Sequence, residues 1–215
     1  MELPAARRAG LGAQRTSDSP LEAGALAGSK KNAQRQRRTI VFVDETGLSE
    51  RPHRRRTWAP RGQTPVLQYH FNWATLSAAA GITEWNFYFR LFPGTIRSPQ
   101  VVEFLEHLLR HIPGRLLIVW DGLRQHRSRM VRDFVAAQRG RIVLEFLPGY
   151  APELNPTEYI WGHLKQHELA NFCPKNLWEL GCFARRALRR MRRRPTLVES
   201  FWKQAGLFDS CHYIM

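Results

Sequence analysis

The chain has 215 residues, of which 43% are apolar and seven are tryptophan, so it can form one sizeable domain with a hydrophobic core. Its formal net charge of +15 indicates a polyanionic partner, with nucleic acid ahead of an acidic membrane surface. Three widely spaced cysteines in no metal-ligand pattern argue against a disulfide framework and for a reducing compartment, and no apolar stretch is long enough to span a membrane.

The first segment, residues 1–37, is rich in Ala, Gly, Ser, Arg and Gln and has almost no large apolar side chains. Such a composition buries too little surface to offset the entropy that is lost on ordering. We therefore expect a disordered basic arm, whose cations either contact phosphates or are merely solvated.

Strand patterns begin directly after this arm. Residues 39–45, TIVFVDE, form a β-branched and aromatic run that is typical of a strand buried on both faces. Residues 54–69 carry proline and glycine around short apolar pieces, and the runs 73–83 and 85–92 predict a hairpin joined at or just after Gly81. Together these patterns predict an antiparallel meander after the first strand.

Helices and strands then alternate along the rest of the chain. Residues 98–112 have apolar side chains at a helical period, with Ser98 as the expected cap. The elements expected beyond this helix are a buried strand at 115–121, a helix at 128–138, a buried strand at 141–148 and basic helices at 174–208. A mixed sheet covered by helices, an α/β fold, is the economical arrangement of this order.

Two of the expected buried strands end in aspartate, at Asp44 and Asp121. Functional groups gather at the carboxyl ends of parallel strands, because the loops there open a crevice over a rigid sheet. Two carboxylates at one edge repel each other, and paired Mg²⁺ ions would relieve this repulsion and activate a phosphodiester for in-line attack. An aspartate after a strand is also a common turn former, so the two residues alone leave a structural role open.

A third carboxylate lies at the expected start of a later helix. Asn155 suits the N-cap and Pro156 the first helical position, which places Glu158 third, at the positive end of the helix dipole. This capping pattern accounts for Glu158 with or without chemistry. Glu45 points to the opposite strand face from Asp44, so we expect for it a supporting or ion-pair role.

Four segments of the chain resemble the DDE endonuclease domain of bacterial insertion-sequence transposases in the mariner group, the branch called insertion sequence family 630. They are VFVDETGLS, WAPRG, WDGLRQHRS and LPGYAPELNPTEYIWGHLK. The resemblance implies a ribonuclease-H-like fold, with a mixed five-stranded sheet flanked by helices. It also implies a catalytic Asp-Asp-Glu triad that binds two Mg²⁺ or Mn²⁺ ions, cleaves transposon ends and joins them to target DNA.

Carried over residue by residue, the triad is Asp44, Asp121 and Glu158, because the acid after N-P-x is the ligand and Glu153 is not. The 36 residues between Asp121 and Glu158 slightly exceed the usual separation in the group. Trp161, one turn after Glu158, is expected in the core. The resemblance further implies double-stranded DNA as partner, self-association on that DNA, and a cytoplasmic, nucleoid-associated location in a bacterium.

The chain departs from the family pattern in two places. Gly122 stands where many relatives carry Asn, while His126 is kept. The expected role of His126 is to hold a phosphate, to orient a ligand or to be a satisfied surface histidine. The front of the chain lacks the helix-turn-helix modules of full transposases, so we expect a catalytic domain at 38–173 with a basic helical extension at 174–215. The alternative is a non-catalytic DNA-binding remnant, and a nuclease of RNA–DNA hybrids has only the fold in its favour.

A basic face is expected near the end of the chain. Residues 183–195 contain seven arginines and no acid, and on a helix Ala187, Leu188 and Met191 would pack inward. The expected DNA-contacting residues are Arg185, Arg186, Arg189, Arg190 and Arg193 on this helix, with Trp58 and Arg61 of WAPRG stacking on or clamping the DNA.

Overall fold

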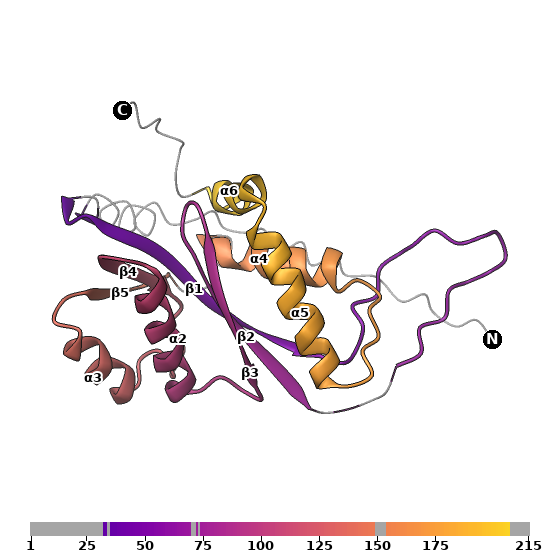
Figure 1. The fold of residues 1–215 in the computed structure, drawn as a ribbon, viewed down its shortest axis with the longest axis horizontal. Helices are drawn as coiled ribbons and strands as arrows, with labels where there is room; N and C mark the ends of the chain where they lie inside the picture. Colours follow the sequence, from indigo (N-terminus) through magenta and orange to yellow (C-terminus); the bar gives the residue numbers. More distant parts are fainter. Residues whose placement is uncertain (1–31, 34, 70–71, 73, 149–153, 207–215) are drawn as a thin grey trace, which may run out of the picture.

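One mixed sheet organises the protein. The computed structural model describes residues 32–33, 35–69, 72, 74–148 and 154–206. Within them, five strands pair in the order β3-β2-β1-β4-β5, and helices lie on both faces of the sheet (Figure 1). The expected mixed five-stranded sheet flanked by helices is therefore confirmed.

The central strand is β1 (Arg38–Ser49), and it pairs in opposite senses with its two neighbours. On one side it is antiparallel to β2 (Thr75–Ile82), which is antiparallel to β3 (Phe87–Pro93). On the other side it is parallel to β4 (Arg115–Trp120), which is parallel to β5 (Ile142–Phe146). Strands β1, β4 and β5 therefore run in the same direction, and β4 and β5 reach their carboxyl ends beside the middle of β1.

The strand predictions hold in outline and differ in extent. The expected hairpin is present, and its turn is closed by the amide of Thr83, which donates to the carbonyl of Asn86 at 2.7 Å. Strand β1 runs on to Ser49 because its second half still pairs with β2. Strand β5 was expected to be buried, but only Ile142 is, because β5 is an edge strand.

Helices α2 (Ser98–His111) and α3 (Arg129–Ala137) cover one face of the sheet. Helix α2 begins at Ser98 itself, so the expected cap is displaced by one residue. Arg97 is the N-cap, and its amide donates to the side-chain oxygen of Gln100 at 3.0 Å. The core on this face joins Val41 and Val43 of β1 to the buried face of α2, formed by Val101, Phe104, Leu105 and Leu108.

The opposite face is covered by α4 (Pro156–His163), α5 (Leu177–Arg192) and α6 (Pro195–Gln204), as Figure 1 shows. A short π-helical turn, η2 (Leu164–Glu168), continues α4. The core on this side contains Phe42 of β1, which lies 5.4 Å from Trp202 of α6 in an edge-on contact, together with side chains from α4, α5 and β4.

The expected basic extension and arm both touch this second core. Buried side chains of α5 and α6 belong to the same apolar cluster as the sheet, and so does Ala33, one of the few residues of the expected arm that the structure describes. Within the described ranges, no helix combines the length and apolar character needed to cross a bilayer.

Candidate active site

The register of the parallel strands brings two aspartates side by side. Phe42 of β1 is paired with Val119 of β4. Asp44 and Asp121 each lie two residues further along the chain, so their side chains leave the sheet on the same face. Neighbouring strands are about 4.7–4.9 Å apart. Two carboxylates are thus placed next to each other at the carboxyl edge, as the sequence predicted.

The start of α4 is fixed against the same edge. Asn155 caps the helix, because its side-chain oxygen accepts from the amide of Thr157 at 3.2 Å, and Pro156 is the first helical residue. The buried hydroxyl of Thr157 donates to the carbonyl of Phe42 at 3.0 Å. This bond ties the first turn of α4, which carries the exposed Glu158, to β1 just before Asp44.

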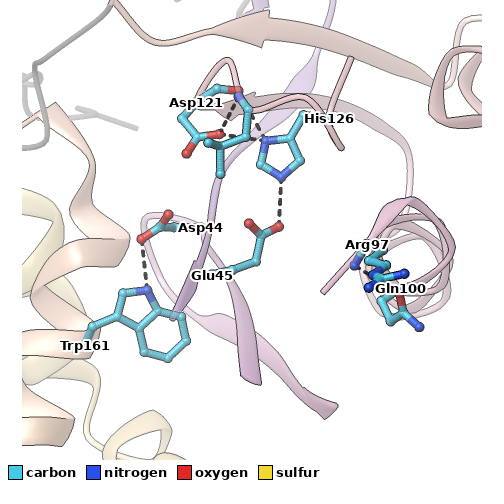
Figure 2. Close-up of polar contacts among 8 residues, drawn as sticks. Asp44, Glu45, Arg97, Gln100, Asp121, His126 and Trp161 are labelled. Carbon is cyan, nitrogen blue, oxygen red and sulfur yellow. Dashed lines mark hydrogen bonds and ion pairs between the residues drawn. The ribbon is translucent and has the colours of Figure 1, made fainter. Parts of the chain in front are cut away.

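Trp161 connects α4 directly to the first aspartate. Its indole Nε1 donates to Oδ2 of Asp44 at 3.0 Å, as Figure 2 shows. The side chain is buried, as predicted, but the hydrogen bond was not predicted. The available signals were that Trp161 lies one turn after Glu158, on the same helix face, and that a buried indole N–H usually finds an acceptor.

Negative charge accumulates at Asp44. Burial of the carboxyl, followed by the nearby charges of Glu158 and Glu45, raises the pKa of Asp44 to about 7, although the hydrogen bond from Trp161 acts in the other direction. The charge of Glu158, in the first turn of α4, thus acts on this aspartate. Near neutral pH, these acids therefore form a site that favours a cation.

His126 links the two strand ends on the other side of the site. It is fully buried, so its interpretation as a surface histidine is wrong. Its Nε2 lies 2.8 Å from Oε1 of Glu45 and its Nδ1 lies 2.7 Å from Oδ1 of Asp121 (Figure 2). The ring stacks flat on Trp120, with centroids 4.3 Å apart and an interplanar angle of 2°. The imidazole thus holds Asp121 in one orientation.

The charges of His126, Asp121 and Glu45 are paired with one another. Burial alone would lower the pKa of His126, but the hydrogen bonds to Asp121 and Glu45 outweigh it and raise the pKa to about 10. Burial works to raise the pKa of Asp121, yet the hydrogen bonds from His126 and from the amide of Leu123 hold it below its usual value. His126 therefore lies between the carboxyl groups of Asp121 and Glu45, and Glu45 forms the ion pair with it that was expected.

A cation also lies beside the site. Lys165 donates from Nζ to the hydroxyl of Thr46, which is two residues beyond Asp44 on β1. Sequence reasoning did not select Lys165. Its spacing from Glu158 is compatible with the same side of an α-helix, but Lys165 lies within the π-helical turn η2, so α-helical periodicity alone could not place it.

The acids suit a divalent cation but are not yet gathered around one. In the part of the chain that the structure describes, no three Asp, Glu, His or Cys side chains form a ready metal-binding group. Asp44 turns to the indole of Trp161 and Asp121 turns to His126. Carboxylate oxygens are the ligands that Mg²⁺ and Mn²⁺ prefer. The donor set therefore fits such an ion once the carboxylates rotate toward it.

The expected basic face of α5 is present. The five selected arginines of this helix region are exposed, and the three apolar side chains between them are buried. Arg190 forms an ion pair with Glu168, so it is partly engaged. Trp58 and Arg61 are exposed and lie in the segment 54–69. The described residues of this segment form no strand, and the chain turns at Gly62, which has a positive φ.

The sheet order, with helices on both faces, places the chain in the ribonuclease-H-like fold class. A family model described as DDE superfamily endonuclease matches residues 39–179. This match covers well over half of the chain, and the chain belongs to that family. No curated protein matches the sequence.

Solved structures of the Mos1 transposase have the same fold. The Mos1 strand transfer complex is 20% identical, with a TM-score of 0.61 over 86% of this chain and 56% of that one. The mariner Mos1 paired end complex with Mg is 18% identical, with a TM-score of 0.62 over 96% and 63%. The Mos1 catalytic domain with raltegravir and Mg is 16% identical, with a TM-score of 0.56 over 89% and 91%. The chain spans less than two thirds of the two longer Mos1 chains.

Proposed function

We propose that this chain is the catalytic domain of a transposase that cleaves DNA and transfers the cut strand. The observation that carries the proposal is the placement of Asp44 and Asp121 next to each other on adjacent parallel strands, with the turn of α4 that bears Glu158 tied to β1 beside them. Membership of the DDE superfamily endonuclease family and the fold shared with the Mos1 transposase support it.

Asp44, Asp121 and Glu158 would hold two divalent cations, Mg²⁺ or Mn²⁺, both of which are named with the Mos1 complexes. Bound cations of this kind lower the pKa of an attacking water or 3′-hydroxyl and stabilise the leaving oxygen. The chain itself holds the ligands in place and needs no covalent intermediate, since most of the protein's contribution to such a reaction is positioning.

Three further residues keep the acids aligned. Trp161 fixes one oxygen of Asp44, and His126, itself held by Glu45, fixes one oxygen of Asp121. Asn155 caps the helix that presents Glu158. Groups that orient metal ligands in this way typically contribute about 10–100-fold to metal affinity or activity.

Double-stranded DNA is the proposed substrate, and the exposed arginines of α5 are the proposed contacts to its phosphates. A net charge of +15 supports a polyanionic ligand. Trp58 and Arg61 are proposed to stack on or clamp the DNA, because both side chains are exposed in the segment 54–69. Joining two DNA ends would need self-association of the chain on DNA.

A second candidate is a DNA-binding remnant that no longer cleaves. It is favoured by the exposed arginines of α5 and the net charge of +15, which support DNA binding without any role for the acids. The two proposals differ in a single assay, conversion of supercoiled plasmid to nicked circles in Mn²⁺.

For the catalytic proposal, we expect nicking that EDTA abolishes. Asp44→Asn, Asp121→Asn and Glu158→Gln should each reduce it by more than about 100-fold, because even supporting groups around metal ligands contribute about 10–100-fold. Asp133→Asn is the matched control, since Asp133 is an exposed acid of α3 that forms an i,i+4 ion pair with Arg129. Equal nicking by the triad variants and the control would overturn the assignment, and DNA binding without any nicking would favour the remnant.

A further inference from the structure

The chain makes a tight turn directly after Asp121. The amides of His126 and Arg127 donate to the carbonyl of Leu123 at 3.1 and 3.3 Å, which brings Arg127 back over Gly122. A Cβ added at Gly122 would lie 2.7 Å from Nη2 of Arg127 and 3.3 Å from its Cζ. The guanidinium thus fills the space that any other side chain at Gly122 would occupy, beside the carboxyl end of β4.

An aromatic stack fixes this guanidinium in place. The Cζ of Arg127 lies 4.7 Å from the ring centroid of Phe146, at the end of β5, which is a cation–π distance. Phe146 is the register partner of Trp120, and Trp120 stacks on His126. The arginine and the histidine that binds Asp121 are therefore held by one continuous set of rings.

The donors of Arg127 remain available to a ligand. The residue is exposed, and within the described ranges neither a hydrogen bond nor an ion pair occupies its guanidinium. Arg129, two residues later, differs in this respect because it pairs with Asp133. An arginine that is oriented but has unused donors beside an acidic site is suited to an anion, and a guanidinium matches the oxygens of a phosphate as a fork.

We propose that Arg127 binds a DNA phosphate next to the reacting one, and that Gly122 is required to leave room for its guanidinium. The inference rests on the proposed function, since it assigns a further contact for the same DNA strand. Its physical reason is that acids at the sheet edge repel an incoming phosphodiester, and a fixed cation beside Asp121 offsets that repulsion where the strand must lie.

The first test measures binding of a short fluorescent DNA duplex by anisotropy, in EDTA so that metal-dependent cleavage cannot occur. Arg127→Gln should weaken binding about tenfold at about 0.1 M salt and reduce the slope of log K against log salt by about 1. Arg129→Gln is the matched control and should leave both quantities unchanged. An Arg127→Gln protein that binds with the wild-type affinity and slope would overturn the proposal.

The second test examines the link to Gly122. Gly122→Ala should weaken binding in the same way, and the double variant with Arg127→Gln should bind no more weakly than Arg127→Gln alone. Additive losses, or no loss in Gly122→Ala, would overturn the requirement for glycine. All these variants should melt within about 2 °C of the wild type, since exposed substitutions cost little. A large fall would indicate a structural arginine instead.

The two proposals can fail separately. A wild-type protein that never nicks plasmid, with Arg127→Gln still weakening duplex binding, would remove the proposed function and keep the phosphate contact. A wild-type protein that nicks, with an Arg127→Gln variant that binds and nicks equally well, would remove only this inference.

Discussion

Removing the charge of Asp44 should make the metal-free protein more stable while it abolishes activity. The carboxyl is partly buried, and this burial together with the charges of Glu158 and Glu45 raises its pKa to about 7 from an ordinary value of 3.8. Asparagine has nearly the same shape and keeps an oxygen that can accept from Trp161. Asp44→Asn therefore removes the repulsion and keeps the packing.

The sign and size of this stability change follow from the difference in proton binding between the folded and unfolded chains. Because the folded pKa is the higher one, the contribution of Asp44 is favourable below pH 3.8 and is lost as the pH rises toward about 7. At about 1.4 kcal/mol per pKa unit, the difference between the two pKa values limits the destabilisation by the charged Asp44 to about 4 kcal/mol. The amide of asparagine is a weaker hydrogen-bond acceptor for Trp161 than the carboxylate, and this difference costs about 1 kcal/mol or more of stability. We therefore expect the free energy of unfolding of Asp44→Asn to exceed that of the wild type by about 1–3 kcal/mol.

Thermal unfolding in EDTA, followed by circular dichroism, measures this gain. For a chain of this size it corresponds to a rise in the melting temperature of about 3–10 °C near pH 8, and the gap should close as the pH falls toward about 4. Added Mn²⁺ should stabilise the wild type and leave Asp44→Asn unaffected, because a ligand stabilises only the form that binds it.

Asp133→Asn provides the control for this experiment, since Asp133 is an exposed acid with an i,i+4 partner. Its melting temperature should follow the wild type at every pH. If Asp44→Asn melted below the wild type near pH 8 in EDTA, the carboxylate would be favourable without a cation. The electrostatic account of the site would then be refuted.

Three other predictions concern the groups around the acids. Trp161→Phe keeps the apolar ring but loses the donor to Asp44, so plasmid nicking should fall about 10–100-fold with a small change in melting temperature; unchanged nicking would contradict the positioning role. In EDTA, wild-type stability should decrease as the pH rises from 6.5 to about 10, because the pKa of His126 is raised in the folded state, and His126→Gln should lack this loss; matching pH profiles would contradict the ion-pair assignment. The double variant Arg186→Gln, Arg189→Gln should bind DNA of any sequence more weakly and lower the salt slope by about 2 in anisotropy titrations; an unchanged slope would remove α5 from the DNA-binding surface.

Local signals were sufficient for much of the fold. Asn155 and Pro156 start α4 where the capping pattern predicted, because caps and prolines act on their own backbone. The two strands that carry Asp44 and precede Asp121 were also recognised, since continuous apolar runs of strand length are typical of buried parallel strands, although β1 continues past Asp44 to Ser49. The edge position of β5 was not predicted, because the order of strands in a sheet depends on how the connections cross the sheet, and this cannot be recognised from the local sequence.

The supporting contacts of the site lie beyond such signals. His126 is in a polar loop by sequence, yet the structure buries it against Trp120 and between two carboxylates. The hydrogen bond from Trp161 to Asp44 joins residues 117 positions apart in the chain. The approach of Arg127 to Gly122 depends on an irregular turn, which has no repeating sequence pattern that would predict it. Each of these contacts requires the tertiary arrangement to be known first.

The central claim is that Asp44, Asp121 and Glu158 form one metal site at the carboxyl edge of the sheet. The most direct test is an anomalous difference map from crystals of the protein with DNA and Mn²⁺. The account predicts manganese peaks coordinated by these three carboxylates, with the carboxylate of Asp121 rotated toward the metal. Peaks coordinated by other acids, or manganese bound at this edge without Glu158, would contradict it.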